Sequence, residues 1–113
     1  MCSSGSLKPM LEKLNAQLHA LFGSHLKATI LYGSYARGDE DEESDVDVLI
    51  LVDLPREEIV NYRRPVARIA GEYLFSDNIL IAPIIENQIF YEQHLDVLPF
   101  YKNIAHEGVP IGA

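Results

Sequence analysis

Apolar residues recur along the chain at two different spacings, which predict helices alternating with strands. Over residues 7–22, leucines stand three or four positions apart, and this spacing predicts an amphipathic helix that stops at Gly23. Two short apolar runs, at residues 28–32 and 46–52, have the length and composition of buried strands. A further run at residues 78–85 predicts a third strand.

Proline and asparagine mark where the next helices should begin. Pro55 is followed by acidic residues, a combination typical of a first helical turn, and this helix is expected to run to residue 75. Pro65 lies inside it and should kink or interrupt it, because proline lacks a backbone donor and clashes with the preceding turn. Asn87 is expected to cap a short helix.

The C-terminal part is predicted to add a last helix and a short edge strand. The helix should cover residues 97–106 and end at Gly108 in the left-handed conformation, and the strand should cover residues 109–111. No internal repeat or linker divides the chain. The pattern therefore predicts an α/β (α+β) fold in two layers, with a small mixed sheet backed by helices in a single domain over residues 7–113, after a flexible N-terminus over residues 1–6.

A glycine-serine turn follows the first predicted strand. The segment GSYARG at residues 33–38 lies where the strand passes into a tight turn or a short helix. Backbone N–H groups exposed at such a turn attract anions. The segment lacks the Gly-Lys-Ser/Thr ending of a P-loop and the glycine spacing of a dinucleotide fingerprint. It is therefore a candidate phosphate-binding turn of another kind.

Two acids lie at the entrance of the second predicted strand, in the segment SDVDV at residues 44–48. The period of two places Asp45 and Asp47 on one face, about 6.6 Å apart along the strand. Two like charges at that separation repel by roughly 2.5 kcal/mol at an effective dielectric near 20. A divalent cation such as Mg²⁺ would turn this repulsion into joint coordination. The alternative is a pair of solvated acids at a half-exposed strand end.

Composition and charge limit the function classes. The 113 residues contain 48% hydrophobic residues, enough for one core, and no run long enough to span a membrane. A formal net charge of -8 argues against direct nucleic-acid binding, because lysine and arginine supply most non-specific affinity for phosphates. The acidic run at residues 39–43 is interpreted as a solvated loop. The lone cysteine and the lack of a signal-peptide pattern at the start predict a cytoplasmic protein.

Taken together, GSYARG and SDVDV resemble the signature of the minimal nucleotidyltransferases of the DNA polymerase beta superfamily, which has the form GSxARG, a spacer, and SDxDL. The resemblance extends over nearly the whole chain and is most specific in these two segments. It implies the nucleotidyltransferase fold, with a nucleotide lying over an open face of the sheet. It also implies two Mg²⁺ ions and ATP or another nucleoside triphosphate as substrate.

The resemblance assigns roles to six residues of the two motifs. Asp45 and Asp47 are implied to bind the two metal ions and to serve as the catalytic residues. The residues implied to contact the nucleotide and its phosphates are Gly33, Ser34, Arg37 and Ser44.

One element of the family pattern is missing from this chain. Family members carry a third carboxylate on a later strand, and the position that we align with it holds an apolar residue near Leu80. Asp77 and Glu86 flank that strand and are the candidates for the third carboxylate. If either acid points toward the acid pair, catalysis is favoured, whereas an apolar wall opposite the pair favours a domain that binds nucleotide or a partner without turnover.

The sequence therefore predicts an Mg²⁺-dependent nucleotidyltransferase that moves a nucleoside monophosphate, AMP from ATP, to an acceptor hydroxyl and releases pyrophosphate. Because a small single domain has little room for an acceptor, we expect the acceptor to belong to another protein. The resemblance supplies a candidate, since small family members act as antitoxins that adenylylate a tyrosine on a HEPN-type ribonuclease. The alternative is a non-catalytic, antitoxin-like binding module.

Overall fold

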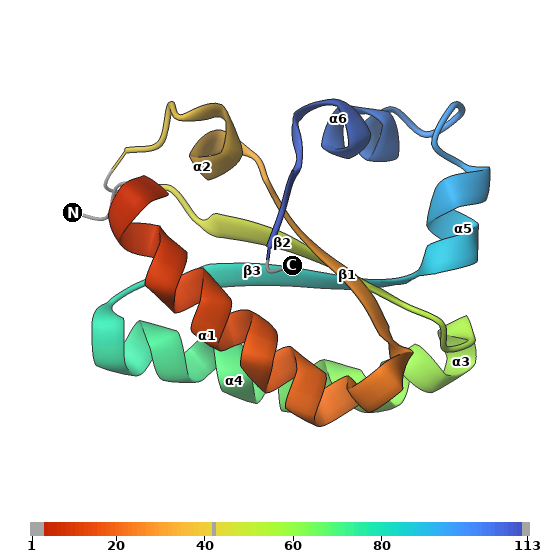
Figure 1. Ribbon diagram of the computed structural model, residues 1–113, viewed down its shortest axis with the longest axis horizontal. Coiled ribbons are helices and arrows are strands. Elements are labelled where there is room, and N and C mark those ends of the chain that lie inside the picture. Colours follow the sequence, from red (N-terminus) through yellow and green to blue (C-terminus); the bar gives the residue numbers. More distant parts are fainter. Residues whose placement is uncertain (1–3, 42, 112–113) are drawn as a thin grey trace.

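The computed structural model describes residues 4–41 and 43–111, and its centre is a four-stranded sheet in the order β3-β2-β1-β4 (Figure 1). The strands are β1 (Leu26–Tyr32), β2 (Val46–Val52), β3 (Ile81–Asn87) and β4 (Val109–Pro110). β1 pairs antiparallel with β2 and β4, whereas β2 and β3 run parallel. This is the mixed sheet predicted from the sequence.

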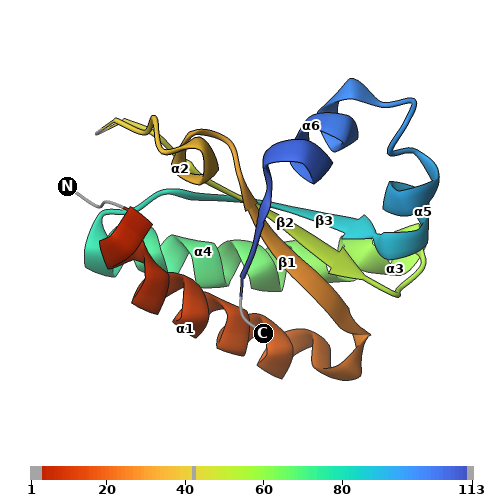
Figure 2. The same cartoon turned by 45° about the horizontal axis from the view of Figure 1, so that its top comes forward.

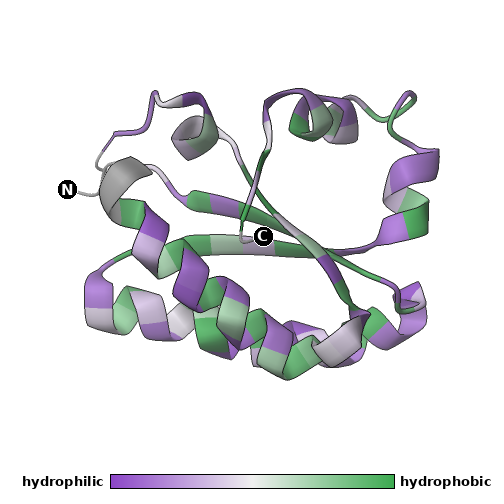
Figure 3. Cartoon of the chain, in the orientation of Figure 1, coloured by the Kyte–Doolittle hydropathy of each residue, from purple (hydrophilic) through white to green (hydrophobic). Residues whose placement is uncertain are grey.

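Two long helices cover one face of the sheet. They are α1 (Ser4–Phe22) and α4 (Arg63–Asp77), which lie side by side below the strands in Figures 1 and 2. The leucines at positions 7, 11, 14 and 18 of α1 are buried against alternate residues of the strands, such as Val48 and Ile50. Hydrophobic and hydrophilic residues alternate along α1 in Figure 3, as expected for a helix with one buried face.

The opposite face of the sheet is covered only in part. The short helices α5 (Gln88–Gln93) and α6 (Pro99–Glu107) pack there over a second core cluster that includes Leu49, Leu51 and Tyr101. The sequence predicted a single layer of helices, and this second cluster is an addition to it. Its aromatic residues lie in segments too short for a clear hydrophobic period, so the sequence pattern did not reveal which face they cover.

Most predicted elements are confirmed, with small shifts of their ends. α1 begins at Ser4 rather than at residue 7, and it ends before Gly23, whose φ is 60°. Of the N-terminal segment predicted to be flexible, residues 1–3 lie outside the described residues. Asn87 caps α5 as predicted, because its side chain accepts a hydrogen bond of 2.9 Å from the Phe90 N–H.

The predicted interruption near Pro65 is also confirmed. The segment consists of α3 (Arg56–Ile59), a 3-10 turn η2 (Val60–Tyr62) and then α4. Pro65 lies in the first turn of α4, where a missing N–H leaves no hydrogen bond unmade.

Two predicted boundaries are wrong. β3 begins at Ile81 rather than at residue 78, because Asn78 adopts a left-handed conformation (φ 56°) and its N–H donates to the Leu74 carbonyl at 3.2 Å, which caps α4. Gly108 follows α6 but is extended, with φ -67° and ψ 147°, and not left-handed. Glycine is needed there for space, since a Cβ would collide with the Ile104 carbonyl and the Ile30 side chain.

Pro83 lies inside β3 without breaking it. β3 is an edge strand that pairs with β2 alone, and a proline is tolerated where its missing N–H faces away from the ladder. In the part of the chain that the structure describes, no helix combines the length and apolar character needed to cross a bilayer.

Candidate functional site

The glycine-serine turn forms a short helix directly after β1. Gly33 has φ 79° and ψ -154°, a conformation open to glycine and almost no other residue. The helix α2 (Ser34–Arg37) follows, and the N–H groups of Ala36 and Arg37 donate to the Gly33 carbonyl at 3.1 Å each. The sequence placed a tight turn or short helix here, and the structure contains both.

Asp47 lies directly against this turn. A Cβ built on Gly33 would overlap the carboxylate of Asp47, so glycine is required at position 33 both for its backbone conformation and for space. Tyr32, the last residue of β1, is the cross-strand partner of Asp47 in β2. The pairing of β1 with β2 therefore brings the two motifs together, although they lie about a dozen residues apart in the sequence.

The acid pair lies at the uncovered corner of the sheet. Asp47 projects to the same face as Leu49 and Leu51, because alternate residues of a strand share a face. The two leucines are buried under α5 and α6, whereas Asp47 is only half-buried and Asp45, just before the strand, is exposed. In Figure 1, α2 lies above the start of β2, and α6 lies above the sheet farther along. The incomplete burial of the two acids leaves both accessible to a ligand at this end of β2.

Electrostatics show that the two acids interact. The pKa of Asp47 is raised, first by burial and second by the negative charge of Asp45, while the positive charge of Arg37 opposes the rise. Burial, followed by the charge of Asp47, raises the pKa of Tyr32 to about 12. Asp47 is therefore a partly desolvated carboxylate beside a second one, a combination that a bound cation would stabilise.

Arg37 is held beside the site by two other carboxylates. Its Nε donates to Asp39 Oδ2 at 3.2 Å and its Nη1 donates to Glu107 Oε1 at 3.1 Å. The hydrogen bond to Asp39 is the main reason that the pKa of the guanidinium is raised. The charge of Arg37 also reaches Asp47, as the opposing effect on the pKa of that acid shows.

The two serines occupy different environments. Ser34 is half-buried at the first position of α2, beside the bend. Ser44 closes the turn before β2: its Oγ accepts from the Asp41 N–H at 2.9 Å and donates to Asp41 Oδ1 at 3.2 Å. Ser44 thus orders the loop that delivers Asp45, and its hydroxyl already has partners within that loop.

Neither candidate for the third carboxylate joins the acid pair. Glu86 faces the same side of the sheet, but it pairs with Leu51, four residues beyond Asp47 and so roughly 13 Å along the strand. Asp77 is exposed at the last position of α4. Among the described residues, no three His, Cys, Asp or Glu side chains come together as a metal-binding group.

Glu86 instead has a structural environment. Its buried carboxylate accepts hydrogen bonds from the Tyr101 hydroxyl and from the Asn87 N–H, the latter at 2.8 Å, and Arg56 Nε lies 3.4 Å away. These contacts join β3 to α6 and α3. The carboxylate is therefore committed to holding α6 on the sheet.

The strand opposite the acid pair is apolar. Ala82 is the cross-strand partner of Asp47 in β3. Leu80 and Ile84, two positions to either side, share its face and are exposed. Leu80 is also fixed beside the start of β2, because its carbonyl accepts from the Val46 N–H at 2.8 Å. An apolar wall therefore stands opposite the acid pair, the arrangement that the sequence analysis associated with binding without turnover.

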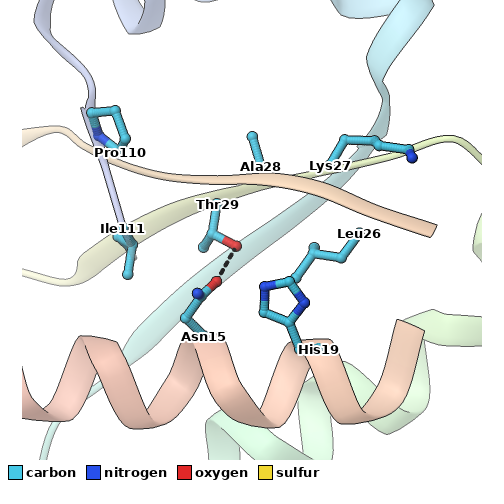
Figure 4. Close-up of a pocket in the computed structure, with 8 residues that line it drawn as sticks. All are labelled: Asn15, His19, Leu26, Lys27, Ala28, Thr29, Pro110 and Ile111. Carbon is cyan, nitrogen blue, oxygen red and sulfur yellow. Dashed lines mark hydrogen bonds between the residues drawn. The ribbon is translucent and has the colours of Figure 1, made fainter. Parts of the chain in front are cut away.

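A separate cavity of about 210 Å³ lies on the other side of the sheet, between α1 and β1 (Figure 4). Thr29 projects into it and donates from its hydroxyl to Asn15 Oδ1 at 2.9 Å. His19 and Lys27 are among the other residues that line it. Thr29 is the cross-strand partner of Ile50, which belongs to the core under α1, so this cavity is distinct from the corner that holds the acid pair.

Sequence reasoning missed two residues of the site. Tyr32 directly precedes the motif, and its position before Gly33 could have marked it as a neighbour of Asp47. Glu107 lies 70 residues from Arg37, and no local pattern connects them. Only the folding of α6 back over the sheet brings Glu107 to the site.

A glycine bend packed against one of two neighbouring acids, at an open corner of a small mixed sheet, is the arrangement expected of a nucleotidyltransferase. A family model described as nucleotidyltransferase domain matches residues 11–108, and the chain belongs to this family. The chain is accordingly assigned to the nucleotidyltransferases.

Relatives in Methanocaldococcus jannaschii carry more specific names. The chain is 37% identical over 93 residues to "Putative protein adenylyltransferase MJ0141", a match that covers 81% of this chain and 91% of the relative. It is 31% identical over 101 residues to "Putative protein adenylyltransferase MJ0604", covering 89% of this chain and 92% of that protein. The chain thus spans nearly the full length of both relatives.

A solved structure has the same fold. The chain superimposes on a crystal structure of a mutant of the toxin-antitoxin MntA-HpeT with a TM-score of 0.56 and 12% sequence identity, covering 90% of this chain and 73% of that chain. At this level of identity the similarity concerns the fold, which agrees with the nucleotidyltransferase fold predicted from the sequence.

Proposed function

We propose that this protein is an Mg²⁺-dependent adenylyltransferase that moves AMP from ATP to a hydroxyl group of a partner protein. The observation that carries the proposal is the packing of Asp47 against Gly33, with Asp45 beside it, at the uncovered corner of the sheet. The names of the two relatives support the choice of a protein as acceptor. The nucleotide, the metal and the partner are parts of this proposal.

The donor set of the site fits Mg²⁺. Asp45 and Asp47 supply two hard carboxylate oxygens, and burial of Asp47, followed by the charge of Asp45, raises the pKa of Asp47 and makes its ionised form unfavourable without a cation. Mg²⁺ commonly uses one or two protein carboxylates and completes its shell with water and phosphate oxygens. When bound, the metal ions would neutralise charge on the phosphates and on the attacking oxygen. Asp45 and Asp47 would hold both ions.

The remaining residues would bind and orient the triphosphate. Gly33 and Ser34 would bring the backbone close to the terminal phosphates, where a side chain at position 33 would intrude. Arg37 would contact a phosphate oxygen from the last position of α2. The acceptor oxygen would then form a bond to the α-phosphorus of ATP as the bond to pyrophosphate breaks, and the proton of the hydroxyl would pass to solvent water.

We propose that the acceptor is a tyrosine hydroxyl on a HEPN-type toxin, with the pair acting in the cytoplasm. The motifs of the antitoxin-type nucleotidyltransferases support this choice, and the fold neighbour is itself described as part of a toxin-antitoxin. The formal net charge of -8 suits a protein acceptor better than a nucleic acid.

A second candidate function is nucleotide or partner binding without transfer. The apolar residues Leu80, Ala82 and Ile84 opposite the acid pair favour it, since within residues 4–41 and 43–111 no third carboxylate joins the pair to accept the proton of the acceptor hydroxyl. In this case the domain would act as an antitoxin by binding alone.

One experiment separates the two candidates. The protein is incubated with α-labelled ATP, Mg²⁺ and the candidate partner, and label on the partner is followed for the wild type and for Asp47→Asn. Transfer by the wild type that is lost in Asp47→Asn supports the enzyme. ATP binding without transfer by either protein supports the binding module, and the absence of both binding and transfer contradicts the proposal.

A further inference from the structure

The contact between Arg37 and Glu107 connects the phosphate-binding turn to α6. Glu107 is the last residue of α6, and its Oε1 accepts from Arg37 Nη1 at 3.1 Å. The Glu107 side chain is 26% exposed, against 60% for Asp39, the other partner of Arg37. The Glu107 pair is thus the less solvated of the two and the less weakened by solvent screening.

The backbone around Glu107 is fixed. The N–H of the next residue, Gly108, donates to the Ile104 carbonyl at 2.7 Å, and its Cα lies so close to Ile30 that no Cβ fits. At the other end of α6, Tyr101 is hydrogen-bonded to Glu86. The helix therefore presents the Glu107 carboxylate to Arg37 from a defined position, and the contact is not that of a loose surface side chain.

The charges around Arg37 are unbalanced. The single positive charge of Arg37 is shared by two hydrogen-bonded carboxylates, those of Asp39 and Glu107. It also acts on Asp47, whose pKa is affected by the negative charge of Asp45 as well. A triphosphate that approaches this site meets an excess of negative charge, and it must compete for the same guanidinium. A carboxylate and a phosphate oxygen make the same charge-assisted hydrogen bond to arginine.

We propose that Glu107 is a further residue of the nucleotide site, whose carboxylate occupies the place on Arg37 that a phosphate oxygen of the triphosphate takes on binding. This inference rests on the proposed function, since it assumes a triphosphate beside Arg37. Glu107 accepts a hydrogen bond from Arg37 Nη1 when no nucleotide is bound. When the nucleotide binds, a phosphate oxygen replaces the Glu107 carboxylate as the acceptor of that bond. Asp39 orients Nε in both states.

Competition outweighs pre-organisation in this arrangement. Glu107 could in principle assist binding by holding Arg37 still, but Asp39 already fixes the guanidinium through Nε. What Glu107 adds is mainly competition for Nη1, the guanidinium nitrogen that its carboxylate already occupies and that a phosphate oxygen would contact. Its neutralisation is therefore expected to tighten binding, up to about fivefold, the size of one exposed ion pair.

The test measures Mg-ATP dissociation constants by calorimetry for the wild type, Glu107→Gln, Arg37→Gln and the double variant. Glu92→Gln, in α5, serves as the matched control, because it removes the same charge from an exposed position. We expect tighter binding for Glu107→Gln, no change for Glu92→Gln, and no gain from Glu107→Gln once Arg37 is replaced.

Each outcome has a distinct meaning. Unchanged or weaker binding by Glu107→Gln, or a gain that persists without Arg37, overturns the role of Glu107 and leaves the proposed function standing. A wild type that does not bind Mg-ATP overturns the proposed function itself and this inference with it. Thermal unfolding of each variant confirms that the fold is retained, since Glu107 lies at a partly exposed helix end.

Discussion

The backbone of Gly33 and the side chain of Asp47 are packed so closely that position 33 has no room for a side chain. Gly33 has φ 79° and ψ -154°, and a Cβ there would overlap the carboxylate of Asp47. The contact links the turn after β1 to the acid on β2. The geometry of the phosphate-binding turn and that of the acid pair therefore depend on each other.

Replacing Gly33 by alanine is expected to damage both stability and metal binding. The backbone conformation alone costs about 1–3 kcal/mol for a residue with a Cβ, and the new methyl group must also displace the Asp47 carboxylate. Gly38→Ala is the matched control, because Gly38 also has a positive φ of 81° but has open space around its Cβ position. Denaturant unfolding should show a lower free energy of unfolding for both variants. The additional stabilisation by Mg²⁺ should be lost in Gly33→Ala alone. Equal Mg²⁺ responses would contradict the link between turn and acid.

Asp47→Asn is expected to stabilise the protein in the absence of metal at neutral pH. The folded-state pKa of Asp47 is raised by burial and by Asp45, so its ionisation opposes folding. Below the unfolded pKa of 3.8 the group is neutral in both states and the variant should gain nothing. The gain should appear as the pH rises from there through the folded pKa. Melting temperatures measured in EDTA at pH 3.5 and pH 7 test this expectation, and a variant less stable than the wild type at pH 7 would contradict it.

A third carboxylate can be introduced on the apolar wall. Ala82→Asp places an acid on β3 directly across from Asp47, and we expect it to tighten Mg²⁺ binding by about tenfold or more by completing a group of three ligands, since even outer-shell partners of a metal contribute about 10–100-fold. Ile84→Asp is the control, since it lies on the same face but roughly 6.6 Å farther along the strand. The metal-dependent shift in melting temperature measures the effect. If both variants respond alike, net charge rather than position is responsible.

Tyr101→Phe is expected to weaken the attachment of α6. It leaves the buried Glu86 carboxylate without one of its donors, a loss of about 1–3 kcal/mol. Burial and the bond to Glu86 raise the pKa of Tyr101 above its ordinary 10.0, so the stabilisation by the neutral phenol is complete below pH 10 and declines at higher pH. The difference between wild type and variant should therefore shrink above pH 10. Tyr91→Phe, in the same cluster, should lower the free energy of unfolding by less. Burial is the cause of the raised pKa of Tyr91, whereas the hydroxyl of Tyr101 also bonds to the buried Glu86 carboxylate.

Local patterns in the sequence predicted the elements and the acid pair, but not the contacts between distant segments. β2 was predicted with its observed bounds, because a run that is apolar except for Asp47, between an acidic loop and Pro55, leaves little choice. The sequence predicted the turn at Gly33 and the acid pair, but not the contact between Gly33 and Asp47. That contact depends on the strand register that pairs Tyr32 with Asp47. Glu86 illustrates the limit: its face could be read from the period of two, but its bond to Tyr101 depends on how α6 packs.

The central claim is that Asp45 and Asp47, beside the bend at Gly33, seat a triphosphate through a divalent cation. The most direct measurement is a calorimetric titration of ATP into the wild type and into the Asp45→Asn/Asp47→Asn double variant, each with Mg²⁺ and with EDTA. We predict binding by the wild type only with Mg²⁺, and a loss of at least about 10–100-fold in the double variant, since even outer-shell partners of metal ligands contribute that much. Equal ATP affinity with and without Mg²⁺, or undiminished binding by the double variant, would contradict the claim.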